Sequence, residues 1–233
     1  MNNSSLNIIT DKPIKTESLA DKVYNIIENN IINMTLKPGS TLSEDEVANA
    51  LNISRSPVRE ALLKLEHVGL VNKKPNGRIV AKITEKEIIN NYEIWEMVES
   101  FAGTLACRNA NEKDFKVIHD ILIKMEELES EEKINDYREL NNQFHLSLVK
   151  PCPNEHLVKM HVNALNKIHW CYNYSISWSS DIMSSSKYHH DIYNAYKDEQ
   201  YDKLEKLIRK HIRDACSRFQ KEFEKKGGEN LES

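Results

Sequence analysis

Glycine and proline, the residues that turn-rich architectures need, are scarce in this sequence. Six glycines and six prolines stand among 233 residues, about 5% of the chain, where average usage gives about 12%. Sandwiches and barrels of β-strands place such residues at each of their many turns. The scarcity disfavours those folds and predicts a mostly helical protein.

Long apolar runs are also missing. No uninterrupted stretch approaches the roughly 20 apolar residues that a transmembrane helix requires. Residues 1–15 are polar and lack the apolar segment of a secretory signal. We therefore expect a cytoplasmic protein without a membrane partner.

Cysteines are few and scattered. The four of them contain no Cys-x-x-Cys pair, which argues against a disulfide framework and against a zinc ribbon. We expect reduced, buried thiols. These residues are Cys107, Cys152, Cys171 and Cys216.

The net charge of −4 hides an uneven distribution of charge along the chain. Residues 1–82 carry 11 basic and 9 acidic residues, whereas residues 83–233 carry 21 and 27. The basic excess is concentrated in residues 54–82, where seven lysines and arginines accompany two glutamates, a local charge of +5. Such a cluster is either a solvated face or a surface for a polyanion such as nucleic acid.

Residues 17–82 carry the signals of three helices and a hairpin. Apolar residues recur at helical spacing in the first helix, Ser43 and Glu46 form a capping box for the second, and Ser56 and Pro57 supply an N-cap and a first residue for the third. Asn76-Gly77 is a hairpin turn. The predicted helices cover Leu19–Ile32, Ser43–Leu51 and Pro57–His67, and the predicted strands cover Leu70–Lys74 and Arg78–Lys82.

This order of elements is that of a winged helix-turn-helix, a DNA-binding fold. The first turn of the third helix and its free N–H groups suit a phosphate-lined major groove, and the hairpin suits the adjacent backbone. We therefore expect double-stranded operator DNA as a partner. The alternative is that Arg55 and Arg59 only pair with Glu60 and Glu66. The residues expected at the DNA are Ser54, Arg55, Ser56 and Arg59 in the helix and Lys73, Lys74 and Arg78 in the hairpin.

Specific motifs follow one another through this part of the chain almost without a gap. They are Leu36–Gly39, Leu42–Glu44, Ser54–Leu62 with the run SRSPVREAL, Gly69–Val71, and Gly77. Together they resemble the DNA-binding domain of GntR-family bacterial transcription regulators.

The resemblance implies DNA contacts at Ser54, Arg55, Arg59 and Gly77. The chain departs from the family at the start of the second helix, where many members have a basic residue and this sequence has Asp45. Either one phosphate contact is missing here or the operator differs.

From Thr84 onward the pattern is helical almost throughout, which predicts an antiparallel six-helix bundle. The predicted helices are Glu87–Arg108, Glu112–Leu128, Ile134–Leu148, Glu155–Trp178, Ser184–Lys197 and Tyr201–Glu224. We divide the chain into a flexible arm (1–16), a DNA-binding domain (17–82), a helical effector-binding and dimerisation domain (83–226) and a tail (227–233).

Four polar residues of the bundle could converge on one point. Asn141 and His145 are four residues apart, so they leave the same face of one helix. His189 and His211 lie on two consecutive helices, at similar distances from the bend near Asp198. If those helices are antiparallel, three imidazoles and an amide oxygen could hold a metal ion in the bundle. The alternative is partly buried, hydrogen-bonded histidines without a metal.

The same segments, Asn141–His145, His189 and Leu207–Ile212, are similar to FCD, the ligand-binding domain of the FadR-like branch of GntR regulators. The resemblance implies a divalent metal ion, zinc or nickel, bound through an Asp and three His, which helps to hold a carboxylate effector. Six helices point to the shorter, VanR-like subgroup. Asn141 replaces the usual Asp and would be a neutral, weaker ligand.

A second departure concerns the effector. Trp95 stands where many FCD domains carry an effector-binding Arg, which puts a simple hydroxy- or keto-acid bound through that Arg in doubt. We expect Trp95, His161 and His169 to line the effector pocket.

These observations favour a homodimeric, effector-controlled transcription factor, a repressor rather than an enzyme. Dimerisation is expected because one winged helix buries little DNA surface and such regulators read palindromic half-sites. The competing hypothesis is a metal-dependent hydrolytic enzyme fused to a DNA-binding domain. No His-Glu-x-x-His motif is present, and Glu139 lies on the wrong face of its helix to act beside His145. An architectural DNA binder without an effector would leave the helical domain unexplained.

Overall fold

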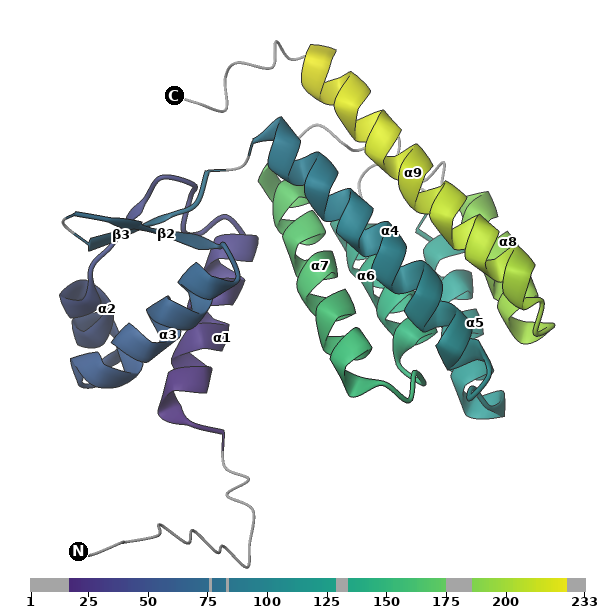
Figure 1. Ribbon diagram of the computed structural model, residues 1–233, viewed down its shortest axis with the longest axis horizontal. Helices are drawn as coiled ribbons and strands as arrows, with labels where there is room; N and C mark the ends of the chain where they lie inside the picture. Colours follow the sequence, from purple (N-terminus) through teal and green to yellow (C-terminus); the bar gives the residue numbers. More distant parts are fainter. Residues whose placement is uncertain (1–16, 76, 83, 129–133, 175–185, 226–233) are drawn as a thin grey trace, which may run out of the picture.

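A computed structural model describes residues 17–75, 77–82, 84–128, 134–174 and 186–225. The predicted arm and tail lie outside these residues. Within them the chain is mostly helical, with one small sheet, as predicted from the sequence. A winged-helix unit, drawn in purple and blue, lies beside a bundle of six helices (Figure 1).

The winged-helix unit consists of three helices and a three-stranded antiparallel sheet of order β1-β3-β2. Its core is made by apolar residues of α1 and α3 that recur at helical spacing, including Val23, Ile27, Ala61 and Leu65. The elements are α1 (Leu19–Ile32), β1 (Thr41–Leu42), α2 (Glu44–Leu51), α3 (Arg55–His67), β2 (Val71–Lys74) and β3 (Gly77–Val80).

Helix α3 begins two residues earlier than the sequence suggested. Ser54 is its N-cap residue and Arg55 its first helical residue, so the prediction of Ser56 as the N-cap and Pro57 as the first residue was wrong. Proline is tolerated anywhere in the first turn, because the N–H groups there have no partner within the helix. Proline therefore marks the first turn of a helix rather than its first residue.

The bundle is formed by six helices, of which α4 is the most central. It contacts α6, α7, α8 and α9, and it runs alongside α9 (Figure 1). A Cβ on Gly103 would lie 3.1 Å from Cδ1 of Ile208, so glycine allows the close packing of α4 on α9. The helices are α4 (Glu85–Cys107), α5 (Glu112–Glu126), α6 (Ile134–Val149), α7 (Glu155–Tyr174), α8 (Ser186–Lys197) and α9 (Tyr201–Lys225).

The ends of these helices follow local signals in the sequence. Thr84 forms a capping box with Glu87 at the start of α4, and Asn111 does so with Asp114 at the start of α5. Glu199 adopts a positive φ of 54° in the tight turn between α8 and α9. That turn brings α8 back against α9.

The two parts of the molecule touch through α1 and α7. Helix α7 is the bundle helix on the side of the winged-helix unit (Figure 1). None of the helices in the described residues combines the length and apolar character that crossing a membrane requires.

Candidate metal centre and nucleic-acid interface

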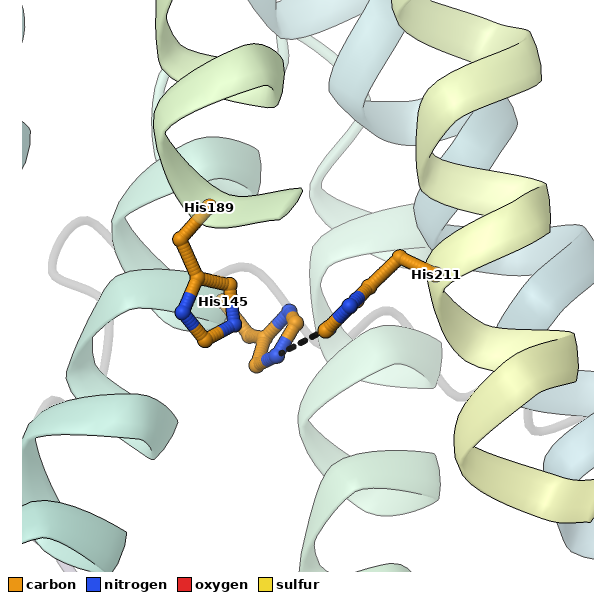
Figure 2. Close-up of side chains that lie close together, drawn as sticks. All are labelled: His145, His189 and His211. Carbon is orange, nitrogen blue, oxygen red and sulfur yellow. Dashed lines mark hydrogen bonds between the residues drawn. The ribbon is translucent and has the colours of Figure 1, made fainter. Parts of the chain in front are cut away.

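Three buried histidines from three helices meet in the bundle. His145 lies on α6, His189 on α8 and His211 on α9, and their side chains converge (Figure 2). One ring nitrogen from each lies within 4.8 Å of the others. We call these residues the histidine triad. The structure thus brings together three of the four residues that the sequence analysis selected as metal ligands.

The triad has the chemistry that a divalent metal ion needs. Nε2 of His211 lies 3.4 Å from Nε2 of His145, and tetrahedral zinc bound at about 2.0–2.1 Å sets its ligand nitrogens about 3.3–3.4 Å apart. Both ring nitrogens of His189 and Nδ1 of His211 are buried without a hydrogen-bond partner in the described residues. Buried polar atoms are normally paired, so unpaired imidazole nitrogens in a cluster of three histidines fit a metal site.

The protonation of His189 and His211 also suits metal binding, which requires neutral imidazoles. Burial, together with the neighbouring His145, lowers the pKa of His211 to about 3. Burial likewise lowers the pKa of His189 well below its usual value, and the two other imidazoles of the triad add to the effect. Both side chains are therefore neutral at pH 7.

Asn141, the fourth residue selected from the sequence, is buried on α6 one helical turn before His145. It leaves the same face of the helix. Its amide oxygen would be the one oxygen ligand in the expected set, and it carries no charge.

A carboxylate that was not expected from the sequence lies next to the triad. Glu99 on α4 is completely buried, and it accepts hydrogen bonds from Nδ1 of His145 at 2.7 Å and from Nε2 of His161 at 2.8 Å. The indole N–H of Trp95 donates to the same carboxylate at 2.5 Å. A signal was present in the sequence, because Glu99 occupies a core position at helical spacing among Tyr92, Trp95 and the buried alanines that follow.

Glu99 remains ionised in this buried place. Burial by itself would raise the pKa of Glu99, but the imidazoles of His145 and His161 outweigh burial and hold this pKa below its usual range. A buried charge is tolerated only when it is paired and fully hydrogen-bonded. The three donors around Glu99 meet that condition.

The residues expected to line the effector pocket separate into two groups. Trp95 and His161 lie next to the histidine triad, because both donate hydrogen bonds to Glu99. The Trp95 indole also packs edge-on against His145, with ring centroids 4.9 Å apart. His169 is further along α7, where its Nδ1 accepts a hydrogen bond from the side-chain amide of Asn142. The structure places His169 in a contact between α6 and α7.

The first turn of α3 is exposed, as a DNA-reading helix requires. Ser54, Arg55, Ser56 and Arg59 all face solvent, and the side chains of Arg55 and Arg59 are 67% and 62% exposed. The two arginines pair with carboxylates, but with those of α2 rather than with Glu60 and Glu66. Arg55 pairs with Asp45, and Arg59 donates to Glu44 through Nη2 at 2.9 Å.

The wing is the hairpin of β2 and β3, and its lysines are exposed whereas its arginine is mostly buried. Lys73 and Lys74 are exposed on β2 and form no ion pair within the described part of the chain. Gly77 opens β3 opposite Lys74 with a φ of +135°, a conformation that other residues rarely adopt.

Arg78, which the sequence also suggested as a DNA contact, packs against the two helices of the helix-turn-helix. Its side chain is only 12% exposed, and its guanidinium donates to Glu44 on α2 and to Glu66 on α3, at 3.0 and 3.2 Å. Arg78 therefore ties the wing to both helices of the helix-turn-helix. The pKa of Glu44 is lowered, first by its hydrogen bond with Arg59 and, against the effect of burial, also by Arg78.

Two family profiles match the chain, one for each part of the structure. Residues 19–80 match "Bacterial regulatory proteins, gntR family" and residues 90–214 match "FCD domain".

Among curated proteins, the chain is 28% identical over 211 residues to "Uncharacterized HTH-type transcriptional regulator YdhC" of Bacillus subtilis, covering 89% of this chain and 93% of that protein. It is 29% identical to "Nta operon transcriptional regulator" of Aminobacter aminovorans, covering 76% and 82% of the two chains.

Solved structures share the fold. The chain superposes on Escherichia coli McbR/YncC with a TM-score of 0.74 at 20% identity, covering 89% of this chain and all of that one. A transcriptional regulator of Rhodococcus sp. RHA1 gives a TM-score of 0.71 at 21% identity, covering 87% and 97%. At these identities the likeness establishes the fold.

Proposed function

Because the chain belongs to the GntR family of bacterial regulatory proteins and carries an FCD domain, we propose that it is a cytoplasmic repressor that binds operator DNA as a homodimer. A small carboxylate bound at the histidine triad changes its affinity for that operator. The observation that carries the DNA-binding part is the exposed first turn of α3, with Arg55 and Arg59 facing solvent.

On binding DNA, the arginines of α3 exchange their carboxylate partners for groups of the DNA. Arg55 and Arg59 leave Asp45 and Glu44 for phosphates and base edges of the major groove, which costs little because exposed ion pairs contribute little stability. Lys73 and Lys74 contact phosphates, and Gly77 lets the wing backbone approach the duplex closely. Arg78 holds the wing in place. Ser54 and Ser56 offer hydroxyl groups to the same backbone.

A homodimer is supported by an apolar stripe on α4. Ile94, Met97 and Phe101 are 44%, 54% and 55% exposed, and their spacing places them on one face of the helix. Exposed apolar side chains gathered on one face indicate a partner surface. The partner is a second copy of the chain, because a dimer reads two half-sites with its two recognition helices.

In the effector domain, His145, His189 and His211 would hold the metal ion, with the Asn141 amide oxygen as a fourth donor. Zinc or nickel suits imidazole ligands. The bound ion supplies a positive charge and a coordination position for a carboxylate. The Trp95 indole N–H is engaged by Glu99 and is not free to bind the effector.

A hydrolytic activity of the triad is disfavoured by the same contacts. A general base must be free to accept a proton from the attacking water. Glu99 accepts three hydrogen bonds and remains engaged with Trp95, His145 and His161. The relatives compared above are named transcriptional regulators.

The test combines DNA binding with metal loading. We expect the zinc-loaded protein to bind a fragment upstream of its own gene in a gel-shift titration, and one compound from a panel of small carboxylates to weaken that binding at least tenfold. His189→Ala should retain DNA binding and lose the response to the compound. The proposal fails if the protein does not bind DNA in preference to an unrelated fragment, or if His189→Ala responds like the wild type.

The dimer is tested separately. Met97→Glu places a charge in the apolar stripe of α4 and should convert the dimer to a monomer in analytical ultracentrifugation. Lys116→Glu, on the exposed face of α5, is the matched control and should leave the dimer intact. A wild-type protein that sediments as a monomer contradicts this part of the proposal.

A further inference from the structure

Glu99 contacts Nδ1 of His145, while Nε2 of the same ring lies near His211. The Nδ1 of His145 lies 2.7 Å from Oε1 of Glu99. An ionised carboxylate only accepts hydrogen bonds, so the Nδ1 position must carry a proton. In the neutral ring that a metal ion requires, the lone pair is then on Nε2, the atom that lies 3.4 Å from Nε2 of His211.

The other carboxylate oxygen is held equally firmly. Oε2 of Glu99 accepts one hydrogen bond from the indole N–H of Trp95 and another from Nε2 of His161. The indole N–H is the only polar hydrogen of the Trp95 side chain, and it can only donate. These contacts come from α4 and α7, while His145 is on α6. The carboxylate is therefore fixed from three directions in a buried site, and it cannot rotate away from His145 without leaving a buried donor unpaired.

We propose that Glu99 is a positioning residue for the metal: it keeps the Nε2 lone pair of His145 directed at His189 and His211. This inference rests on the metal site of the proposed function. Metal-bound histidines commonly donate their other ring N–H to such a second group, and its loss typically weakens metal binding about 10- to 100-fold. Since Asn141 brings no charge, Glu99 is also the carboxylate that offsets part of the charge of the ion.

A glutamine in place of Glu99 distinguishes positioning from simple packing. It has the same shape but one acceptor oxygen and one NH₂ donor. If its oxygen serves Trp95 and His161, its NH₂ faces His145 and requires an unprotonated Nδ1. The proton of His145 then moves to Nε2, and the metal must displace it.

The experiment measures zinc affinity by competition with a chromophoric chelator and the His145 tautomer by long-range ¹H–¹⁵N NMR. For Glu99→Gln we expect zinc affinity to fall about 10- to 100-fold and the His145 proton to move from Nδ1 to Nε2 in the metal-free protein. Glu96→Gln is the matched control, because Glu96 is a carboxylate of the same helix that pairs with Arg209 and Arg213 instead. It should leave both measurements unchanged.

Each outcome has one meaning. A wild-type protein that takes up no zinc contradicts the metal part of the proposed function. Wild-type zinc uptake with an equal affinity and an unchanged tautomer in Glu99→Gln overturns the role of Glu99 alone. If Glu99→Gln does not fold, the metal-free wild type decides, because His145 protonated on Nε2 overturns the inference and His145 protonated on Nδ1 supports it.

Discussion

The buried Glu99 beside the histidine triad and the first turn of α3 both place charged groups close to hydrogen-bonding partners, but they differ in their access to water. Glu99 and its donors are completely buried, whereas Arg55 and Arg59 are mostly exposed. A buried charge loses several kcal/mol of solvation and depends on each of its partners, while exposed pairs are screened and contribute little. The comparison predicts large effects on stability in the bundle, and effects on DNA binding alone at α3.

The largest expected effect follows from removing the buried carboxylate. Glu99→Ala leaves Trp95, His145 and His161 as buried donors without an acceptor, and we expect it to lower the free energy of unfolding by about 3–5 kcal/mol. Urea denaturation of the metal-free protein measures this loss. Glu96→Ala, on the same helix, should cost clearly less, because water can reach Arg213 when its partner is gone. Equal losses in the two variants would contradict the contrast drawn above.

The sequence carried most of the information about the fold and part of that about the triad. Helical periodicity predicted α1 with its observed bounds, and the spacing of His189 and His211 around a bend brought these two residues together. Helical spacing marks Glu99 as a core position, but local patterns could not reveal its partners, because His145 and His161 are 46 and 62 residues away in the chain. The same holds for Arg78, whose carboxylate partners lie on two other elements. β1 has only two residues, which are too few to show the alternation of apolar and polar residues that predicts a strand.

The second prediction concerns pH. His211 has a folded pKa of about 3 and that of His189 is also lowered, so the unfolded chain binds more protons than the folded one between about pH 6.5 and pH 3. The free energy of unfolding is therefore highest, with respect to these two histidines, above about pH 6.5, and it decreases as the pH falls. We expect the metal-free protein to lose up to about 1.4 kcal/mol per pH unit for each histidine. Urea titrations at several pH values measure the slope of the free energy of unfolding against pH. His211→Gln should reduce this slope by the contribution of one histidine proton.

The third prediction concerns the exposed face of α3. Arg59→Ala removes a guanidinium expected to contact a base edge or phosphate, and operator affinity should fall about 10- to 100-fold. The melting temperature should hardly change, since the pair with Glu44 is exposed on the arginine side. Gel-shift titrations at fixed salt measure the affinity. Arg108→Ala is the control, because Arg108 lies over the Tyr201 ring at the far end of α4; an equal loss in both variants would exclude α3 as the reading helix.

The smallest expected effect belongs to the wing lysines, which are exposed and have no ion-pair partner within the described residues. Lys73→Ala should weaken binding to operator and unrelated DNA alike by a few-fold, and it should reduce the slope of log affinity against log salt concentration by about one, because one phosphate contact releases about one counterion. Arg78→Ala should behave differently. Its guanidinium holds the wing against α2 and α3, so its loss should lower the melting temperature as well as the affinity. A Lys73→Ala variant that discriminates between operator sequences would show that the wing reads bases, and a stable Arg78→Ala variant with only a reduced salt slope would show that Arg78 contacts phosphate after all.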